Sequence, residues 1–151
     1  MQQLNLPPYQ ANVKKIGGMV KIMDILRRKF VALTPEEWVR QNFVHFLIEK
    51  KGYSSTLMAN EVALELNGTK RRCDTVVYTL GDNGELKPRM IIEYKAPDVE
   101  ITQRVFNQIT RYNMVLQVEY LVVSNGMKHF CCRVDIEKGE YVFLKDIPTE
   151  L

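Results

Sequence analysis

The pattern of apolar and polar positions predicts a helix over residues 34–53. Thr34 is a suitable N-cap, Pro35 suits the first helical position, and Gly52 suits the residue after the helix end. Apolar side chains recur on one face of this segment at helical spacing, at Val39, Phe43, Phe46 and Leu47. The segment therefore predicts an amphipathic helix that packs on a core.

Runs rich in β-branched and apolar residues predict strands after this helix, at 61–66, 73–80 and 89–95. The turn sequence GDNGE joins the last two strands and predicts a hairpin of residues 71–80 and 88–95. A second helix follows over about 100–116 with Asp98 as its N-cap, and further strands are predicted at 119–125, 129–135 and 141–147. This order predicts an α/β fold with a mixed central sheet flanked by helices.

The N-terminal part of the chain gives a weaker pattern. Residues 1–19, with Pro7–Pro8 and Gly17–Gly18, predict an arm, and residues 20–151 predict a single domain. Residues 20–33 fit either a helix or a pair of strands.

Composition narrows the function classes. The chain has 151 residues and a net charge of +3, which permits a nucleic-acid partner without requiring one. No apolar run approaches the roughly 20 residues of a membrane span, and the N-terminus lacks signal-peptide features. Three cysteines, two of them adjacent, predict reduced thiols in a cytoplasmic protein, and two histidines without a CxxC argue against structural zinc.

Candidate chemistry gathers where the strand over 89–95 ends. Side chains alternate along a strand, so Glu93 and Lys95 share a face. If the two strands of the hairpin pair, Asp74 meets Glu93 across them. Two adjacent carboxylates repel unless a cation lies between them, and Mg²⁺ or Mn²⁺ suits such oxygen ligands. The alternative is a solvated Glu–Lys salt bridge that does no chemistry.

The second predicted helix bears polar residues that could serve such a site. Gln108 and Tyr112 are four residues apart and lie on one side of the helix. Gln103, Arg104, Asn107 and Arg111 are its other polar groups. Two interpretations stay open here, a surface amphipathic helix and a helix that lends Gln108 to an active site. On the first helix, the helical phase places Glu36 on the inward side and Glu37 on the opposite side, where it suits a capping role.

Together these residues resemble the PD-(D/E)xK nuclease superfamily, in its branch with a Q-x-x-x-Y motif. The motifs are Asp74, then Glu93-x-Lys95, then Gln108-x-x-x-Tyr112. Over about residues 20–145 the segments TPEEWVRQ, RRCDTVVY, IIEYKAP, QITRYN and YLVVSNG resemble the N-terminal nuclease domain of type I restriction enzyme R subunits. Cys73 stands where the superfamily name has proline.

The resemblance implies a restriction-endonuclease-like αβββαβ core and Mg²⁺-dependent (or Mn²⁺-dependent) cleavage of phosphodiesters, with DNA as the expected partner. It also implies residue roles. Asp74 and Glu93 would bind the metal together with a first-helix acid, for which the phase argument favours Glu36. Lys95 and Gln108 would complete the catalytic set, and Gln103, Arg104, Arg111 and Tyr112 would contact nucleic acid.

No G-x-x-x-x-G-K-[ST] phosphate loop occurs, so no ATP-driven motor is expected in this chain. The expectation is a nuclease that acts alone, as a homodimer or with a partner subunit. Two alternatives stay open, a non-catalytic nucleic-acid-binding or assembly module of the same fold, and a structural protein with a coincidental motif.

Overall fold

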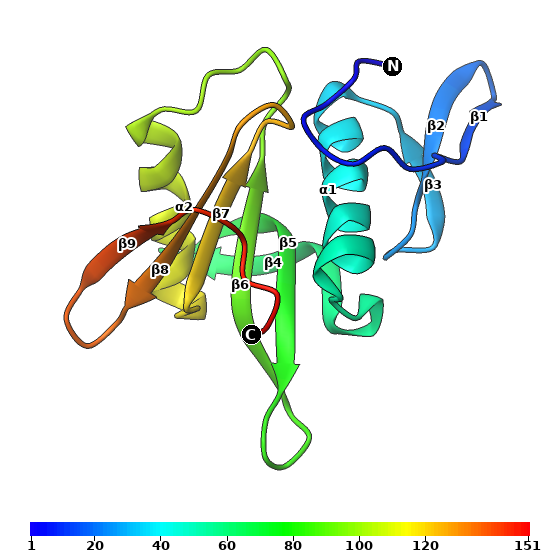
Figure 1. Ribbon diagram of the computed structural model, residues 1–151. Coiled ribbons are helices and arrows are strands. Elements are labelled where there is room, and N and C mark those ends of the chain that lie inside the picture. Colours follow the sequence, from blue (N-terminus) through cyan, green and yellow to red (C-terminus); the bar gives the residue numbers. More distant parts are fainter.

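A mixed six-stranded sheet lies between two helices in the computed structural model, which describes residues 1–151 (Figure 1). The strand order is β4-β5-β6-β7-β8-β9, and only β6 and β7 run parallel. Helix α2 makes the crossover between these two parallel strands, and the other neighbours pair antiparallel. The strands are β4 Met58–Leu66, β5 Thr69–Leu80, β6 Leu86–Tyr94, β7 Tyr120–Ser124, β8 His129–Asp135 and β9 Glu140–Leu144.

The sequence correctly predicted this mixed α/β architecture and the β5–β6 hairpin. Several boundaries differ from the predicted ones, among them the starts of β4, β5 and β6, the end of β9 and the start of α2. The last strand ends at Leu144, because the chain turns there and buries Ile147 against the core. Helix α2, Gln103–Leu116, begins after Thr102 rather than after Asp98. Residues 95–102 instead form a loop that leads from the end of β6 to the helix.

Helix α1, Pro35–Lys51, begins and ends as its sequence predicted. The Thr34 hydroxyl accepts a hydrogen bond from the Glu37 backbone N–H, and Gly52 takes the left-handed conformation at the C-terminus. A single 3-10 turn, η1 Ser55–Leu57, connects the helix to β4. The exposed acid Glu36 lies in the first turn and Lys50 in the last, which suits the helix dipole.

Residues 20–33 form strands, which settles the ambiguity between a helix and a strand pair. β1 Val13–Ile16, β2 Met19–Asp24 and β3 Lys29–Ala32 make a separate antiparallel sheet. Figure 1 shows this small sheet beside α1, on the side away from the central sheet. Helix α1 is therefore covered on two sides. The small sheet includes residues 13–16 and 19 of the predicted arm, so this part of the arm forms strands.

The first residues of the arm pack against the body of the chain. Leu4 is buried, and the Asn5 backbone N–H donates to the carbonyl of Gly126 in the β7–β8 turn. The Trp38 indole N–H donates to the carbonyl of Gln2. The arm thus closes over the N-terminal part of α1 near the end of β7.

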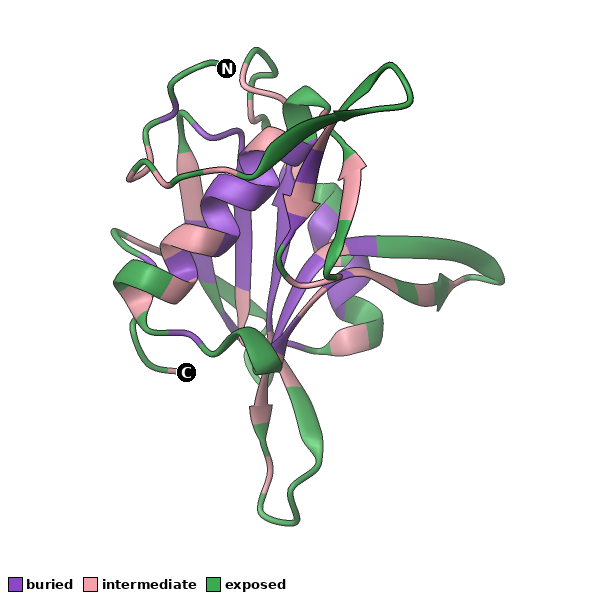
Figure 2. Ribbon diagram, turned by 90° about the vertical axis from the view of Figure 1, so that its right-hand side faces the viewer, coloured by how far each residue is buried: buried purple, intermediate pink, exposed green.

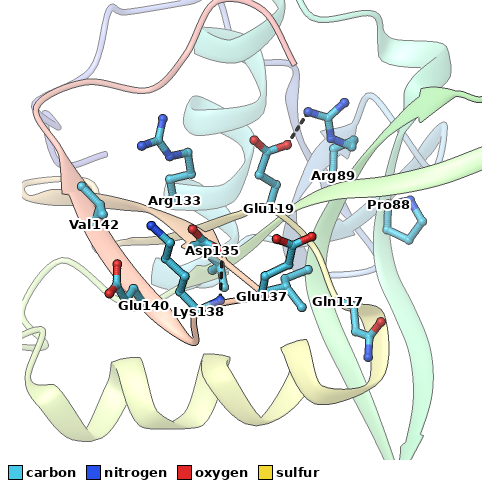
Figure 3. A pocket seen from close by; sticks show the side chains of 12 residues that line it. Pro88, Arg89, Gln117, Glu119, Arg133, Asp135, Glu137, Lys138, Glu140 and Val142 are labelled. Carbon is cyan, nitrogen blue, oxygen red and sulfur yellow. Dashed lines mark hydrogen bonds and ion pairs between the residues drawn. The ribbon is translucent and has the colours of Figure 1, made fainter.

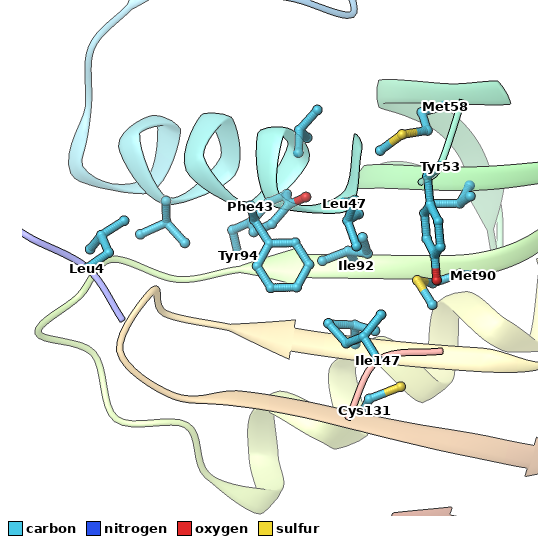
Figure 4. Packing of buried hydrophobic residues seen from close by; sticks show 14 residues of the cluster. Leu4, Phe43, Leu47, Tyr53, Met58, Met90, Ile92, Tyr94, Cys131 and Ile147 are labelled. Carbon is cyan, nitrogen blue, oxygen red and sulfur yellow. The ribbon is translucent and has the colours of Figure 1, made fainter. Parts of the chain in front are cut away.

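Two apolar cores lie on the two faces of the central sheet. One fills the space between the sheet and α1 and includes Phe43, Leu47, Ile92 and Tyr94 (Figure 4). The other lies beneath α2 around Ile91, Phe106, Ile109 and Leu121. Buried residues follow the central strands and the inner side of α1 in Figure 2, whereas the β5–β6 hairpin tip is exposed. No helix combines the length and apolar character that crossing a membrane requires.

We predict that Gly126→Ala destabilises the chain more than Gly139→Ala does. Both glycines have positive φ, +84° and +64°, so both substitutions carry the left-handed penalty of about 1–2 kcal/mol. Only at Gly126 would the new methyl meet neighbours, at 2.8 Å from Leu4 Cδ2 and 3.2 Å from Val39 Cγ2. Urea unfolding should show an additional loss of roughly 1 kcal/mol or more at Gly126.

Limited proteolysis provides the second measurement, because the clash should displace the arm. Faster cleavage within residues 1–12 is expected for Gly126→Ala alone. Equal stability and equal proteolysis of the two variants would show that the arm is not seated against this turn.

Candidate active site

Asp74 on β5 and Glu93 on β6 lie opposite each other, as the strand alternation predicted. The β5–β6 register pairs Thr75 with Ile92, and one further step along it places Asp74 beside Glu93. The Tyr94 backbone N–H donates to Asp74 Oδ2 at 2.9 Å. The two side chains are close enough that each contributes to the pKa of the other.

This carboxyl pair is held in an environment that disfavours two negative charges. Burial and, next, the charge of Asp74 raise the pKa of Glu93 to about 8, while Lys95 opposes the shift. Burial also raises the pKa of Asp74, against the lowering effects of the Tyr94 N–H and of Arg40. The pair therefore retains a proton near neutral pH unless a cation compensates it.

Lys95 lies beside this pair, immediately after β6 ends. Its ammonium is 3.7 Å from Glu93 Oε1, and its backbone N–H donates to the carbonyl of Ser124 at the end of β7. The Lys95 side chain is 23% exposed, whereas that of Glu93 is 9% exposed. The lysine thus has one side toward the carboxylate and one toward solvent, where a substrate could approach.

Asp74 and Glu93 fit a Mg²⁺ or Mn²⁺ ion in the chemistry of their oxygens. Mg²⁺ is usually bound by one or two carboxylates, with water and substrate phosphate in its remaining positions. No group of three or more His, Cys, Asp or Glu side chains gathers anywhere in the chain. In such a site Asp74 and Glu93 would supply carboxylate oxygens to the metal.

Behind Asp74, toward α1, lies the buried guanidinium of Arg40. It donates to both oxygens of the Glu37 carboxylate, from Nε at 2.9 Å and from Nη2 at 2.7 Å. Its Nη1 donates to Glu61 on β4 at 2.7 Å and to the Asp74 carbonyl at 3.0 Å. One side chain of α1 therefore fixes the backbone of β5 at the residue that bears the candidate metal ligand.

Further buried polar groups extend this arrangement to the small sheet and to β6. Asn60 donates to both carboxylate oxygens of Asp24 at 3.1 Å, and the Thr75 hydroxyl donates to Asn60 at 2.6 Å. The Tyr94 hydroxyl donates to Thr75 at 2.9 Å. Every one of these buried groups has a partner, as a low-dielectric interior requires.

The capping role predicted for the Glu37 side chain is wrong. Glu37 is buried and binds Arg40 and Arg27 of the β2–β3 turn, and it accepts from Gln41 at 3.0 Å. The phase argument assumed that α1 has one buried face, but the small sheet covers a second.

Glu36 is exposed, although it is near enough to contribute to the raised pKa of Glu93. Its role as a metal ligand stays a prediction.

On α2, Gln108 and Tyr112 lie on one side of the helix, as their spacing predicted, and both line one cleft. Burial raises the pKa of Tyr112, and the next contribution comes from Glu93, so the phenol lies close to the carboxyl pair. Gln103 is exposed and donates to Asn107 at 3.1 Å on the same helix. The remaining predicted nucleic-acid contacts, Arg104 and Arg111, are exposed and line a cleft together with Gln108 and Tyr112.

A larger hollow of about 690 Å³ lies away from these residues, around the start of β7 and the β8–β9 turn (Figure 3). Its cations are Arg89, Arg133 and Lys138, and its acids are Glu119, Asp135, Glu137 and Glu140. Arg89 and Glu119 form an ion pair at 2.6 Å. This mixed lining contains none of the predicted site residues and does not favour one sign of ligand charge.

Sequence reasoning missed Arg40, Glu61 and Arg71. Arg40 follows Glu37 by three residues, so a helical ion pair could have been anticipated. Glu61 lies at a positive φ of 57° on β4 and is half-buried beside Arg40, which no local pattern indicates. Arg71 precedes Asp74 by three residues and lines the cleft beneath α2.

Comparison with known proteins identifies the family to which this chain is similar. Residues 35–148 match the family model described as type I restriction enzyme R protein N terminus (HSDR_N). No curated protein matches the chain. The matched range begins at the first residue of α1 and extends past β9, so it includes the central sheet and both helices.

We predict that Arg40→Met destabilises the chain by about 3–5 kcal/mol, because it leaves the Glu37 carboxylate buried without its main partner. The matched control is Arg89→Met, which breaks an arginine–glutamate pair of similar length. The side chains of Arg40 and Glu37 are 10% and 7% exposed, whereas those of Arg89 and Glu119 are 28% and 40% exposed. The control should therefore lose less than about 1 kcal/mol in urea unfolding. Equal losses would show that burial does not set the strength of the Arg40 pair.

We predict that the chain loses stability in EDTA as pH rises from about 5 to about 8. The pKa of Glu93 is raised from 4.5 to about 8, so in this window the folded chain retains a proton that the unfolded chain has released. The lost free energy of unfolding is on the order of a few kcal/mol. Glu93→Gln should remove most of this slope.

Thermal melts across the pH range in EDTA would measure this effect. Glu65→Gln, at an exposed position of β4, is the control and should follow the wild-type slope. A Glu93→Gln slope identical to that of the wild type would mean that Glu93 does not retain a proton in the folded state.

Proposed function

We propose that this chain, which belongs to the type I restriction enzyme R protein N-terminal family, is a metal-dependent nuclease domain that hydrolyses phosphodiester bonds in DNA. Family membership supports a role in a restriction system. The observation that carries the proposal is the buried Asp74–Glu93 carboxyl pair with Lys95 at its solvent side. Burying two carboxyl groups side by side lowers the stability of the fold, because both cannot ionise without a cation. A metal-dependent reaction would explain why the chain places them together.

The order of elements supports the same proposal. From α1 to β7 the chain runs helix, three strands, helix, strand, which is the αβββαβ order of a restriction-endonuclease-like core. Asp74 lies on the second of these three strands, and Glu93 and Lys95 lie at the end of the third. These positions support the proposal, because they bring the three motif residues to one end of the β5–β6 pair.

In the proposed reaction, Asp74 and Glu93 hold Mg²⁺ or Mn²⁺ next to the scissile phosphate. The metal would supply Lewis-acid polarisation and an activated water. Lys95 presents a positive charge from the strand end, where it stabilises negative charge that develops on the phosphate oxygens. Because Glu93 is protonated near neutral pH without a cation, metal binding must displace its proton.

The α2 residues would position the substrate. Gln108 and Tyr112 lie one helical turn apart, and Tyr112 lies close to Glu93, so the two side chains would orient groups at the metal. Arg104 and Arg111 are exposed on the same helix and would contact backbone phosphates, and Gln103 lies near its N-terminus. We propose that Glu36 assists at the metal, and its influence on the pKa of Glu93 supports this role.

We predict that Lys95→Ala lowers the rate of Mg²⁺-dependent cleavage by about 10²-fold or more, because it removes charge stabilisation in the transition state. DNA binding and melting temperature should change little, since the ammonium is partly exposed and phosphate affinity is spread over several cations. The measurements are cleavage of plasmid, linear and single-stranded DNA and of RNA, with Mg²⁺ or Mn²⁺ against EDTA.

Lys87→Ala is the matched control. Lys87 is an exposed lysine of β6, at the end of the strand remote from Glu93. The Lys87→Ala variant should cleave at the wild-type rate. Equal cleavage by the wild type and Lys95→Ala would exclude Lys95 from catalysis. Metal-dependent cleavage that appears only after a partner subunit is added would assign the domain to a larger assembly. Binding without cleavage under every condition would favour a non-catalytic binding module.

A further inference from the structure

The β4–β5 hairpin brings a second set of cations to the candidate site. Lys70, Arg71 and Arg72 follow one another at the start of β5, and all three are exposed. Figure 2 shows this hairpin projecting from the body of the domain at the right of the view. A projecting arm with three consecutive positive charges is positioned to contact a ligand that lies against the adjoining surface.

Arg71 shares a cleft with the arginines of α2. The cleft has a volume of about 370 Å³ and is lined by Leu66, Arg71, Arg104, Gln108, Arg111 and Tyr112. None of its three arginines forms an ion pair, whereas Arg72 next to them lies 3.9 Å from Glu61. Like charges that converge without an acidic partner repel each other, and an anion in the cleft would reverse that repulsion.

The cleft borders the carboxyl pair. Tyr112 lines the cleft, is buried, and is close enough to Glu93 for that group to raise its pKa. Gln108, one helical turn before Tyr112, also lines the cleft. An anion in the cleft therefore lies next to the position where the scissile phosphate would be bound.

We infer that the β4–β5 hairpin is a phosphate-backbone clamp, in which Arg71 closes the cleft opposite Arg104 and Arg111 and holds the nucleic-acid strand beside its scissile phosphodiester. This inference rests on the proposed function and adds the surface along which the strand runs. The recognition is independent of base sequence, because guanidinium groups on backbone phosphates position a strand without reading its bases. The mixed-charge hollow at the other end of the sheet offers no such surface.

Binding measured in EDTA separates the clamp from cleavage. The probes are a labelled DNA duplex, the corresponding single strand and an RNA of the same sequence, each titrated at several salt concentrations. Arg71→Ala should weaken duplex binding roughly tenfold and reduce the slope of log K against log salt concentration by about 0.9, the value for one lost phosphate contact. Arg71→Lys should retain most of the slope, since it keeps the charge.

Arg133→Ala is the matched control. Arg133 is an exposed arginine of β8 in the mixed-charge hollow. Its substitution by alanine changes the net charge as much as Arg71→Ala does, but it should leave the DNA affinity and the salt dependence near the wild-type values. Unchanged binding by Arg71→Ala, or equal losses in Arg71→Ala and Arg133→Ala, would overturn the clamp. So would failure of the wild type to bind any probe. Melting temperatures confirm that both variants are folded.

The same proteins distinguish the clamp from the catalytic proposal. Glu93→Gln should lose metal-dependent cleavage while it binds the probes at least as tightly as the wild type in EDTA. If Glu93→Gln cleaves normally, the assignment of the active site fails and the binding result for Arg71 still stands. If Arg71→Ala binds normally while Glu93→Gln is inactive, only the clamp is refuted.

Discussion

The buried ion pair between Glu37 and Arg40 is the interaction on which the site depends. Removing each charge from water costs several kcal/mol. The attraction within the pair offsets this cost only when the geometry is good and further hydrogen bonds are formed. Both conditions are met, because Arg40 binds Glu37 through two nitrogens and also reaches Glu61 and the Asp74 carbonyl. The network joins α1 to β4 and β5, and Arg27 joins it to the small sheet.

This network also determines the electrostatics at Asp74. Arg40 approaches Asp74 through the backbone carbonyl, and two carboxylates, Glu37 and Glu61, share its positive charge. Arg40 therefore lowers the pKa of Asp74 only against a larger effect of burial, and the pKa stays raised. A more fully exposed cation on the other side, Lys95, opposes the shift of Glu93 without cancelling it. The carboxyl pair therefore needs either a retained proton or an additional cation to offset its charge.

Charge on the surface is distributed differently at the two ends of the molecule. Around the β8–β9 turn, cationic and acidic side chains are mixed, and Arg89 forms an ion pair with Glu119. Beneath α2, the arginines converge without acids and lie beside the one place where buried carboxyls retain a proton. A polyanion is attracted to the second surface, and its attraction brings backbone phosphates toward the residues proposed to cleave them.

The sequence alone determined the local parts of this arrangement. Strand alternation placed Glu93 and Lys95 on one face, and the turn between β5 and β6 predicted the hairpin that sets Asp74 opposite Glu93. Helical spacing placed Gln108 and Tyr112 on one side of α2, where both line one cleft. Each of these follows from a fixed period of the backbone or from turn chemistry, which act over a few residues.

The tertiary structure decided everything that depends on which surfaces meet. Residues 20–33 became strands and covered a second side of α1, so Glu37 was buried and its predicted capping role was wrong. The packing of α1 on the central sheet gave Arg40 its partners on β4 and β5, and the hairpin of β4 and β5 carried Arg71 to the arginines of α2. Periodicity within one element fixes the direction of a side chain, but only the packing of distant elements fixes what that side chain meets.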